Sequence, residues 1–410
     1  MLSLLAVVLC YLFFSYLIYR IIRNHIISLK PVELITAFGA KIIMGCFYGF
    51  IFLNYYEGDD TWLLHANSIK EKQMLLDDPY QFFWEFGPST AIKNGNGFFE
   101  TFRLYLVDLE YCLQAKTLGI INLLSQENYY VNVVFWNFFL FWGHFWLFKL
   151  LVKEFPNKRK LYFLLLFLFP PVIFWLSGIR SDGLIFLAFG LLLLYFHRWL
   201  YSHRLKSLIC WLAGFAGLMI FRPAVAILIV PALFSWWLSK RLTLRPVFIF
   251  AGVYLASTIV FFLSATGPYD LPAFVAKRQA EFMQLKGSSF ELDKLEPSLP
   301  GFATVLPQAA VNTLIRPYPW ETEGLLQAMA ALESIFFWAV LIYAIFKPER
   351  GWRKVLSSSL VLLLIIFGLS LYLFIGYTIP FPGAIVRYKI IGEICLFAAL
   401  VALLRPPASH

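Results

Sequence analysis

Long apolar runs recur along the whole chain, and they constrain its fold more than any other feature of the sequence. As helices, such runs cross roughly 30 Å of hydrocarbon. Of the 410 residues, 60% are hydrophobic and only 14% are charged, which leaves too little polar surface to cover a water-soluble globule. The sequence therefore predicts an all-α polytopic bundle of about eleven transmembrane helices, over residues 2–19, 33–54, 129–151, 161–176, 183–200, 207–221, 223–239, 247–265, 326–346, 355–376 and 385–404.

The positive charge of the chain, a net +10, is concentrated in short connections between these runs. Because it is scattered over many connections, it argues against a nucleic-acid partner and for membrane topology. Cytoplasmic connections are enriched in Lys and Arg, so the basic set is expected inside, the N-terminus outside and the C-terminus in the cytoplasm. The basic set holds 18 Lys and Arg against two acidic residues, at 20–32, 153–160, 197–206, 239–245, 347–354 and from 405 onward.

Two long loops, 55–128 and 266–325, carry more acidic than basic residues and are expected on the extracytoplasmic side. In the first loop, apolar residues recur at helical spacing over about 62–76 and again over 98–113, which predicts two helices lying in the membrane interface. The stretch 77–97 between them is rich in turn-forming residues and is expected to be irregular. We expect one transmembrane domain over residues 1–410 that carries these two loops.

Three carboxylates stand where the second apolar run ends, in the sequence Tyr-Tyr-Glu57-Gly-Asp59-Asp60. Acidic groups at this depth are costly unless they bind a cation, a hydroxyl group or a basic side chain. A carboxylate here would deprotonate an acceptor hydroxyl, or would hold a divalent cation such as magnesium or manganese at Asp59 and Asp60. The same residues also fit a solvated helix end at which Asp60 caps the next helix.

The short connection PPVIFWLSGIRSDG places Arg180 and Asp182 between two apolar runs. A planar guanidinium binds two phosphate oxygens at once and stays charged in a low dielectric, so Arg180 is a candidate phosphate ligand and Asp182 a candidate substrate ligand. The alternative is a helix cap formed by Ser181 or Asp182, with Arg180 reaching lipid headgroups.

Three further arginines, Arg222, Arg316 and Arg387, also lie at predicted extracytoplasmic helix ends, against the positive-inside bias. Each alone would anchor a lipid headgroup, whereas four arginines converging with Arg180 would form a pocket for a phosphate-bearing donor. Trp320 and Glu321 follow Arg316 and are candidates to stack on a sugar face and to accept from a sugar hydroxyl, although Trp320 also fits ordinary interfacial packing.

Ionisable residues inside the predicted helices are expected to support the fold. Lys41 is expected to extend its amino group to the cytoplasmic interface. Glu333 and Glu393 are expected to pair with Arg316, Arg387 or Lys389, because pairing relieves the cost of burial. His65 and His144 lack metal-ligand spacing and are interpreted as ordinary interfacial or packing residues.

The acidic pair Asp59-Asp60 followed by TWLLHANS resembles the pattern of the GT-C superfamily of membrane glycosyltransferases, which includes protein O-mannosyltransferases and lipid A aminoarabinose transferases. The stretch FPPVIFWLSGIRSDGLIFLAFGLLL, with RPYPWE and VRYK, is similar to segments of bacterial membrane proteins linked to polysaccharide assembly. The extra span over 2–19 departs from the pattern, and so does the lack of a sizeable soluble C-terminal domain.

The resemblance implies a transferase of the cell envelope, in the bacterial inner membrane, that moves a hexose or pentose from a polyprenyl-phosphate or polyprenyl-diphosphate donor to a hydroxyl of a glycan, lipid or protein. Asp60 or Asp59 would be the base or metal ligand, and the arginines would stabilise the leaving phosphate. Three alternatives stay open, and one of them is a non-catalytic membrane partner that holds an assembly together. An O-antigen polymerase or ligase would depend less on the acidic pair, and a transporter or flippase would carry a lipid-linked anion through the same arginines.

Overall fold

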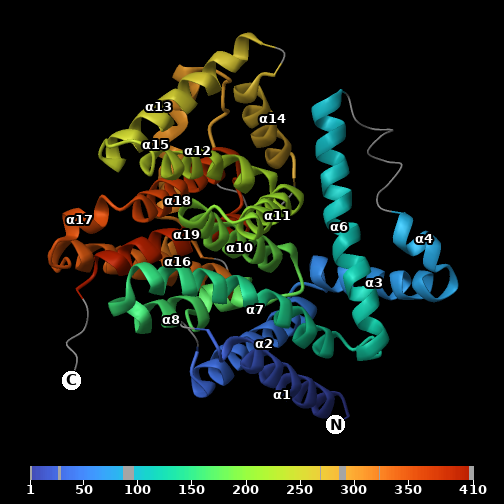
Figure 1. The fold of residues 1–410 in the computed structure, drawn as a ribbon. Coiled ribbons are helices and arrows are strands. Elements are labelled where there is room, and N and C mark those ends of the chain that lie inside the picture. The colour runs from blue at the N-terminus through green and yellow to red at the C-terminus, as the bar shows by residue number, and fades with distance from the viewer. Residues whose placement is uncertain are drawn as a thin grey trace. The chain divides into compact units, whose positions relative to one another are not determined.

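The computed structural model describes residues 2–25, 29–85, 97–267, 269–285, 292–322 and 324–405. Within these ranges the regular secondary structure is helical, apart from one isolated β-bridge between Pro348 and Leu404. The chain divides into two compact units, Met1–Ala226 and Ile227–His410. The expected all-α class is confirmed, and each unit is described by itself below (Figure 1).

The first unit is built around helix α7, which packs against α1, α2, α6, α8 and α10. Nearly every turn of α7 is buried, as expected for a helix that is apolar on all faces. The helices of this unit are α1 (Leu2–Ile22), α2 (Pro31–Asn54), α3 (Asp59–Asp77), α4 (Pro79–Trp84), α6 (Phe98–Ser125), α7 (Tyr129–Glu154), η1 (Pro156–Lys158), α8 (Arg159–Phe167), α9 (Pro170–Trp175), α10 (Ser181–Ser202) and α11 (Leu205–Phe221); α12 (Pro223–Ser239) crosses the boundary.

The two helices predicted in the first loop are present as α3 and α6, which lie side by side (Figure 1). A buried polar chain ties them to α7: Asn122 of α6 donates to Ser68 of α3 at 2.8 Å, and Asn132 of α7 donates to Asn122 at 2.7 Å. Buried amides that bond each other specify one arrangement of helices. These contacts place the first turn of α3, which carries the aspartates. The position of helices α3 and α6 in the membrane interface stays a prediction.

The expected irregular stretch 77–97 is partly wrong, because Pro79–Trp84 forms helix α4. Asp78 caps this helix by accepting from the backbone N–H of Gln81 at 3.0 Å, and Pro79 occupies the first turn, where its missing N–H costs nothing. The residues 86–96 of the same stretch lie outside the described residues.

The second unit packs α18 against α19, with α15 lying across α18. The contact of α15 with α18 is close, because a Cβ atom on Gly376 would lie 2.1 Å from the Ala309 carbonyl oxygen. The helices are α13 (Pro246–Leu263), η2 (Ser264–Thr266), α14 (Leu271–Met283), α15 (Leu299–Leu314), η3 (Pro319–Glu321), α16 (Leu325–Phe346), α17 (Trp352–Leu356), α18 (Ser359–Thr378) and α19 (Pro382–Leu403). The described residues of the loop 266–325 are therefore largely helical.

Seven helices among the described residues are long and apolar enough to span a membrane, and they make the chain a multi-pass membrane protein. Two further apolar helices, α11 and α12, have 17 residues each, and α19 carries three charged residues. The expected count of about eleven spans is not confirmed. The seven are Leu4–Ile22, Pro31–Asn54, Tyr129–Glu154, Ser181–Ser202, Pro246–Thr266, Leu326–Phe346 and Ser359–Thr378.

The expected span over 161–176 is not one helix. It breaks into α8 and α9 between Phe167 and Pro170, where Phe169 takes an extended conformation with ψ of 118°. Pro170 and Pro171 cannot donate backbone hydrogen bonds to the preceding turn, and the residue before a proline is biased away from helix. The apolar composition is therefore right for the membrane, but the backbone is discontinuous.

Candidate functional site

The turn between α2 and α3 places the acidic cluster. Three successive residues, Glu57, Gly58 and Asp59, have positive φ angles of 53°, 100° and 35°. The Gly58 N–H bonds back to the Phe52 carbonyl at 2.8 Å, and α3 begins at once with Asp59 and Asp60 in its first turn. Gly58 is the residue that caps α3, so the capping role considered for Asp60 is wrong. Glu57 is exposed.

Arg180 lies about 120 residues further along the chain and contacts this turn. Its guanidinium donates to Asp59 Oδ2 at 2.8 Å and to Asp60 Oδ2, so that one arginine binds both carboxylates. The hydroxyl of Tyr48 on α2 lies 3.4 Å from the same guanidinium. The side chain of Arg180 is 10% exposed, against 32% for Asp59 and 68% for Asp60. The ion pair therefore has a buried cationic side and an open carboxylate side.

A second ion pair lies beside the first. Asp182, in the first turn of α10, is buried and accepts from Arg222 Nη2 at 3.3 Å. Burial alone would lower the pKa of the Arg180 guanidinium, but its surroundings raise it above its usual value through Tyr48 and the carboxylates of Asp182, Asp60 and Asp59. Two guanidinium groups, of Arg180 and Arg222, thus lie among three carboxylates in this site of the first unit.

The loop that carries Arg180 is pressed against α2. A Cβ atom on Gly45 would lie 2.6 Å from the Ser177 carbonyl oxygen, and one on Gly178 would lie 2.7 Å from the Tyr48 ring. Thr61 of α3 donates to the Ile179 carbonyl at 3.1 Å and shares a 2.8 Å hydrogen bond with the Tyr129 hydroxyl. The site thus includes Tyr48, Thr61 and Tyr129, which sequence reasoning missed. Their signal was weak, because aromatic and hydroxyl residues are common throughout the chain.

The remaining candidate residues lie in the second unit. Arg316 forms an ion pair with Glu321 at 3.3 Å and donates to Asn312 Oδ1 at 3.3 Å. Trp320 is 79% exposed and stacks on Tyr318 with ring centroids 4.9 Å apart. Arg387 donates to the Tyr388 hydroxyl at 3.2 Å. Convergence of these residues with Arg180 stays a prediction.

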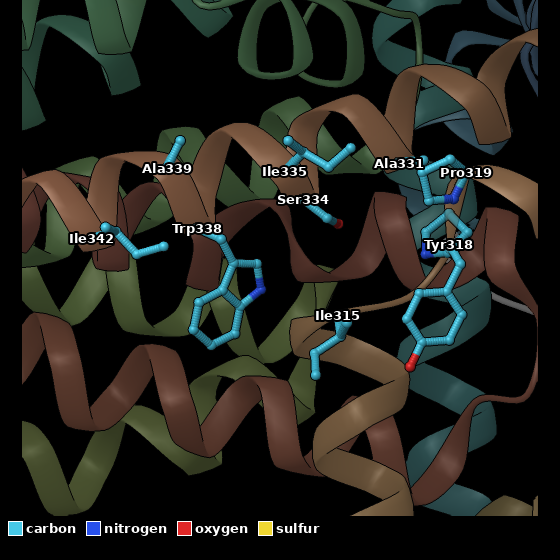
Figure 2. Close-up of a pocket in the computed structure, with 10 residues that line it drawn as sticks. Ile315, Tyr318, Pro319, Ala331, Ser334, Ile335, Trp338, Ala339 and Ile342 are labelled. Carbon is cyan, nitrogen blue, oxygen red and sulfur yellow. The ribbon is translucent and has the colours of Figure 1, made fainter.

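An apolar groove of about 340 Å³ runs beside Arg316 in the second unit. Figure 2 shows it along α16, from Ala331 to Ile342, with Trp338 and Ile315 in its wall and Tyr318 at one end. The eleven helical steps from Ala331 to Ile342 correspond to about 16 Å. Ile315 and Pro317, the two neighbours of Arg316 in sequence, both line the groove.

The ionisable residues inside helices differ from expectation. Lys41 is fully buried and bonds to the Leu176 carbonyl at 2.9 Å, so the expected extension to the cytoplasmic interface is wrong. His144 is not a simple packing residue, because its Nε2 lies 3.0 Å from Lys41 Nζ. Glu333 interacts electrostatically with Glu393 and with Lys389, one of the three basic residues expected as its partner.

No cluster of three or more histidine, cysteine, aspartate or glutamate residues with the geometry to hold a metal ion occurs in the part of the chain that the structure describes. Asp59 and Asp60 by themselves could hold a magnesium ion if water and a substrate phosphate supplied the other ligands. The open side of Asp60 is compatible with such a ligand set.

The helices and their composition define the class of this chain, a polytopic helical membrane protein. No family model, curated protein or solved structure matches it.

Proposed function

We propose that this chain is a membrane glycosyltransferase, similar to the GT-C superfamily, that moves a sugar from a polyprenyl-phosphate or polyprenyl-diphosphate donor to an acceptor hydroxyl. The observation that carries the proposal is the contact of Arg180 with both Asp59 and Asp60, from segments 120 residues apart. Paired carboxylates and guanidinium groups at the ends of apolar helices suit a transfer reaction, because the acceptor hydroxyl loses a proton and the leaving phosphate gains negative charge.

The exposed fractions of the side chains support a division of roles. Asp60 is the most open of the three groups, so it is the candidate base that takes the proton of the acceptor hydroxyl. The hydroxyl oxygen then bonds to the anomeric carbon of the sugar as the bond from that carbon to the phosphate oxygen breaks. Arg180 holds the aspartates in place. The side chain of Arg222 is 24% exposed, against 10% for Arg180, so Arg222 is the more accessible of these two arginines to a leaving phosphate.

The groove in the second unit supports the proposal that the sugar donor is linked to a lipid. It is apolar and lies along a membrane-spanning helix (Figure 2), and Ile315 and Pro317, the sequence neighbours of Arg316, line it. A hydrocarbon chain gains free energy by filling such a groove, and the arginine would face the phosphate at its end. The acceptor, whether glycan, lipid or protein, has no comparable signal on the chain.

A divalent cation is part of the proposal only as a ligand of Asp59 and Asp60. Magnesium or manganese there would supply positive charge to a donor phosphate. A metal-dependent enzyme is expected to lose transfer with a chelator and to regain it when magnesium is restored, whereas a metal-independent one keeps its rate.

The test is transfer from a radiolabelled polyprenyl-phosphate hexose by the full chain in nanodiscs, with a panel of glycan and lipid acceptors. Asp60→Asn is expected to lower the transfer rate about 100-fold or more, because general-base catalysis contributes that much. Asp77→Asn is the matched control, an exposed carboxylate at the other end of the same helix. Full transfer by Asp60→Asn would overturn the assignment and favour the polymerase or ligase alternative.

The broken helix α8–α9 favours a second candidate, a transporter or flippase for a lipid-linked anion, because transporters use discontinuous helices at their binding sites. The two candidates separate in proteoliposomes that hold a fluorescent polyprenyl-phosphate sugar. A transferase consumes the donor and releases polyprenyl phosphate, whereas a flippase moves the intact donor across the bilayer.

A further inference from the structure

The break between α8 and α9 removes a hydrogen bond that a continuous helix would make. In an α-helix the carbonyl of residue 166 accepts from the N–H of residue 170. Residue 170 is proline and has no N–H, so the Leu166 carbonyl loses this partner. A buried carbonyl without a donor is destabilising, and there is no water in a bilayer core to replace the donor.

His144 supplies the missing donor. Its Nδ1 lies 2.7 Å from the Leu166 oxygen, and the ring is fully buried on α7. A carbonyl oxygen only accepts, so Nδ1 carries the proton, and Nε2 of a neutral ring is left as an acceptor. That acceptor lies 3.0 Å from Lys41 Nζ.

Lys41 bonds to the other end of the broken segment. Besides His144, its amino group lies 2.9 Å from the Leu176 carbonyl oxygen and 3.1 Å from Ser177 Oγ. Three acceptors match the three N–H bonds of an ammonium group. The Leu176 carbonyl follows the last turn of α9 and has no further helix to accept from, so Lys41 does for this end what His144 does for the other.

The loop after α9 is then bonded at each of its next carbonyls. Asn137 donates to the Ser177 carbonyl at 2.8 Å, the backbone N–H of Arg180 donates to that of Gly178 at 2.9 Å, and Thr61 donates to that of Ile179. Side chains of helices α2, α3 and α7 therefore hold three of the four residues before Arg180, and the fourth, Gly178, is bonded by the Arg180 backbone itself. Arg180 has little freedom to leave Asp59 and Asp60 while these bonds last.

We propose that Lys41, oriented by His144, is the positioning residue of this site: it fixes the end of α9 and thereby the guanidinium of Arg180 against Asp59 and Asp60. The catalytic meaning of this role rests on the proposed function. The positioning itself does not, because it is measured on the arginine without any substrate.

The measurement is the rate at which phenylglyoxal modifies Arg180, followed by peptide mass spectrometry on the full chain in nanodiscs, with exposed Arg204 as the internal reference. In the wild-type chain Arg180 is protected by burial and by its ion pairs. Lys41→Met keeps the apolar stem and removes all three donors. It is expected to raise the Arg180 rate roughly tenfold relative to Arg204, which corresponds to about 1.4 kcal/mol of lost positioning.

The matched control is Lys116→Met, because Lys116 is also a buried lysine of the first unit that bonds to a carbonyl, that of Phe82 at 2.8 Å. It is expected to leave the Arg180 rate unchanged. Lys41→Gln, which keeps two amide donors on a side chain one atom shorter, is expected to give an intermediate rate. An intermediate rate in Lys41→Gln separates positioning from a general loss of structure. A general loss of structure would raise the Arg180 rate equally in Lys41→Met and Lys116→Met.

If Lys41→Met does not yield folded protein, Ser177→Ala takes its place, because it removes one of the three acceptors and no charge. A twofold to threefold increase in the Arg180 rate is then expected. Unchanged reactivity of Arg180 in Lys41→Gln and Ser177→Ala would overturn the inference. Increased reactivity of Arg180 in the variants, together with no sugar transfer by the wild-type chain, would uphold the inference and count against the glycosyltransferase.

Discussion

Asp182 is the buried acid of the site, in contrast to the open Asp60. It lies 3.3 Å from Arg222 and interacts electrostatically with Arg180, so it carries negative charge between two cations. Removing one partner of a buried ion pair leaves uncompensated charge, and we expect Asp182→Asn to lower the free energy of unfolding by about 3 kcal/mol. Thermal unfolding in detergent checks this, with Asp77→Asn expected to change stability by less than about 0.5 kcal/mol.

His65 predicts how stability depends on pH. Burial lowers its pKa below the usual 6.5, against the opposing effect of Glu127. The ring also accepts from Asn132 at 3.3 Å, which a doubly protonated ring cannot do. Below about pH 6.5 the unfolded chain binds a proton that the folded chain resists, so stability is full above this value and falls as pH decreases.

The variant that checks this is His65→Gln. Unfolding midpoints measured from about pH 7.5 down to about pH 5 should fall less steeply for it than for the wild-type chain. His203→Gln, at an exposed histidine, is the control and should keep the wild-type slope. Identical slopes for His65→Gln and the wild type would contradict the assignment of a buried, neutral His65.

At the scale of helices, small residues decide how closely α7, α10 and α11 approach. A Cβ atom on Gly190 of α10 would lie 2.4 Å from the Gly143 carbonyl oxygen of α7, and one on Gly214 of α11 would lie 2.6 Å from the Leu192 nitrogen of α10. Helices in membranes rely on such close backbone packing, because lipid is as apolar as their side chains.

Gly190→Ala is therefore expected to push α7 and α10 apart and to lower the free energy of unfolding by about 1–3 kcal/mol. Gly252→Ala is the matched control, because Gly252 lies in α13 with open space around its Cα, and alanine there should stabilise the helix by up to about 1 kcal/mol. Denaturation followed by tryptophan fluorescence compares the two. Equal midpoints for both variants would sink the packing argument.

For the whole molecule, the basic connections predict which side of the membrane each loop faces. In a background without the five cysteines, all of which are free thiols here, Gln73→Cys reports the first long loop and Thr243→Cys reports the basic connection 239–245. Both positions are exposed. By the positive-inside rule, an impermeant maleimide should label Gln73→Cys in intact cells and Thr243→Cys only after permeabilisation. The reverse pattern would place the aspartates on the cytoplasmic side.

The helices were predictable from sequence, whereas the break in one of them was not read from it. The apolar runs and the helices of the first loop follow from patterns within a few residues, and they are present as helices apart from the run 161–176. The run 161–176 has the composition of a span, and composition does not report how a backbone with two prolines will fold.

The sequence alone determined that this is a polytopic helical membrane protein, because hydropathy and length decide which segments enter lipid. It also marked Asp59, Asp60 and Arg180 as residues out of place among apolar neighbours. Only the tertiary structure decided that Arg180 binds both aspartates and that Lys41 and His144 serve the carbonyls of a broken helix. Such partners are chosen by packing between distant helices, which no local pattern encodes.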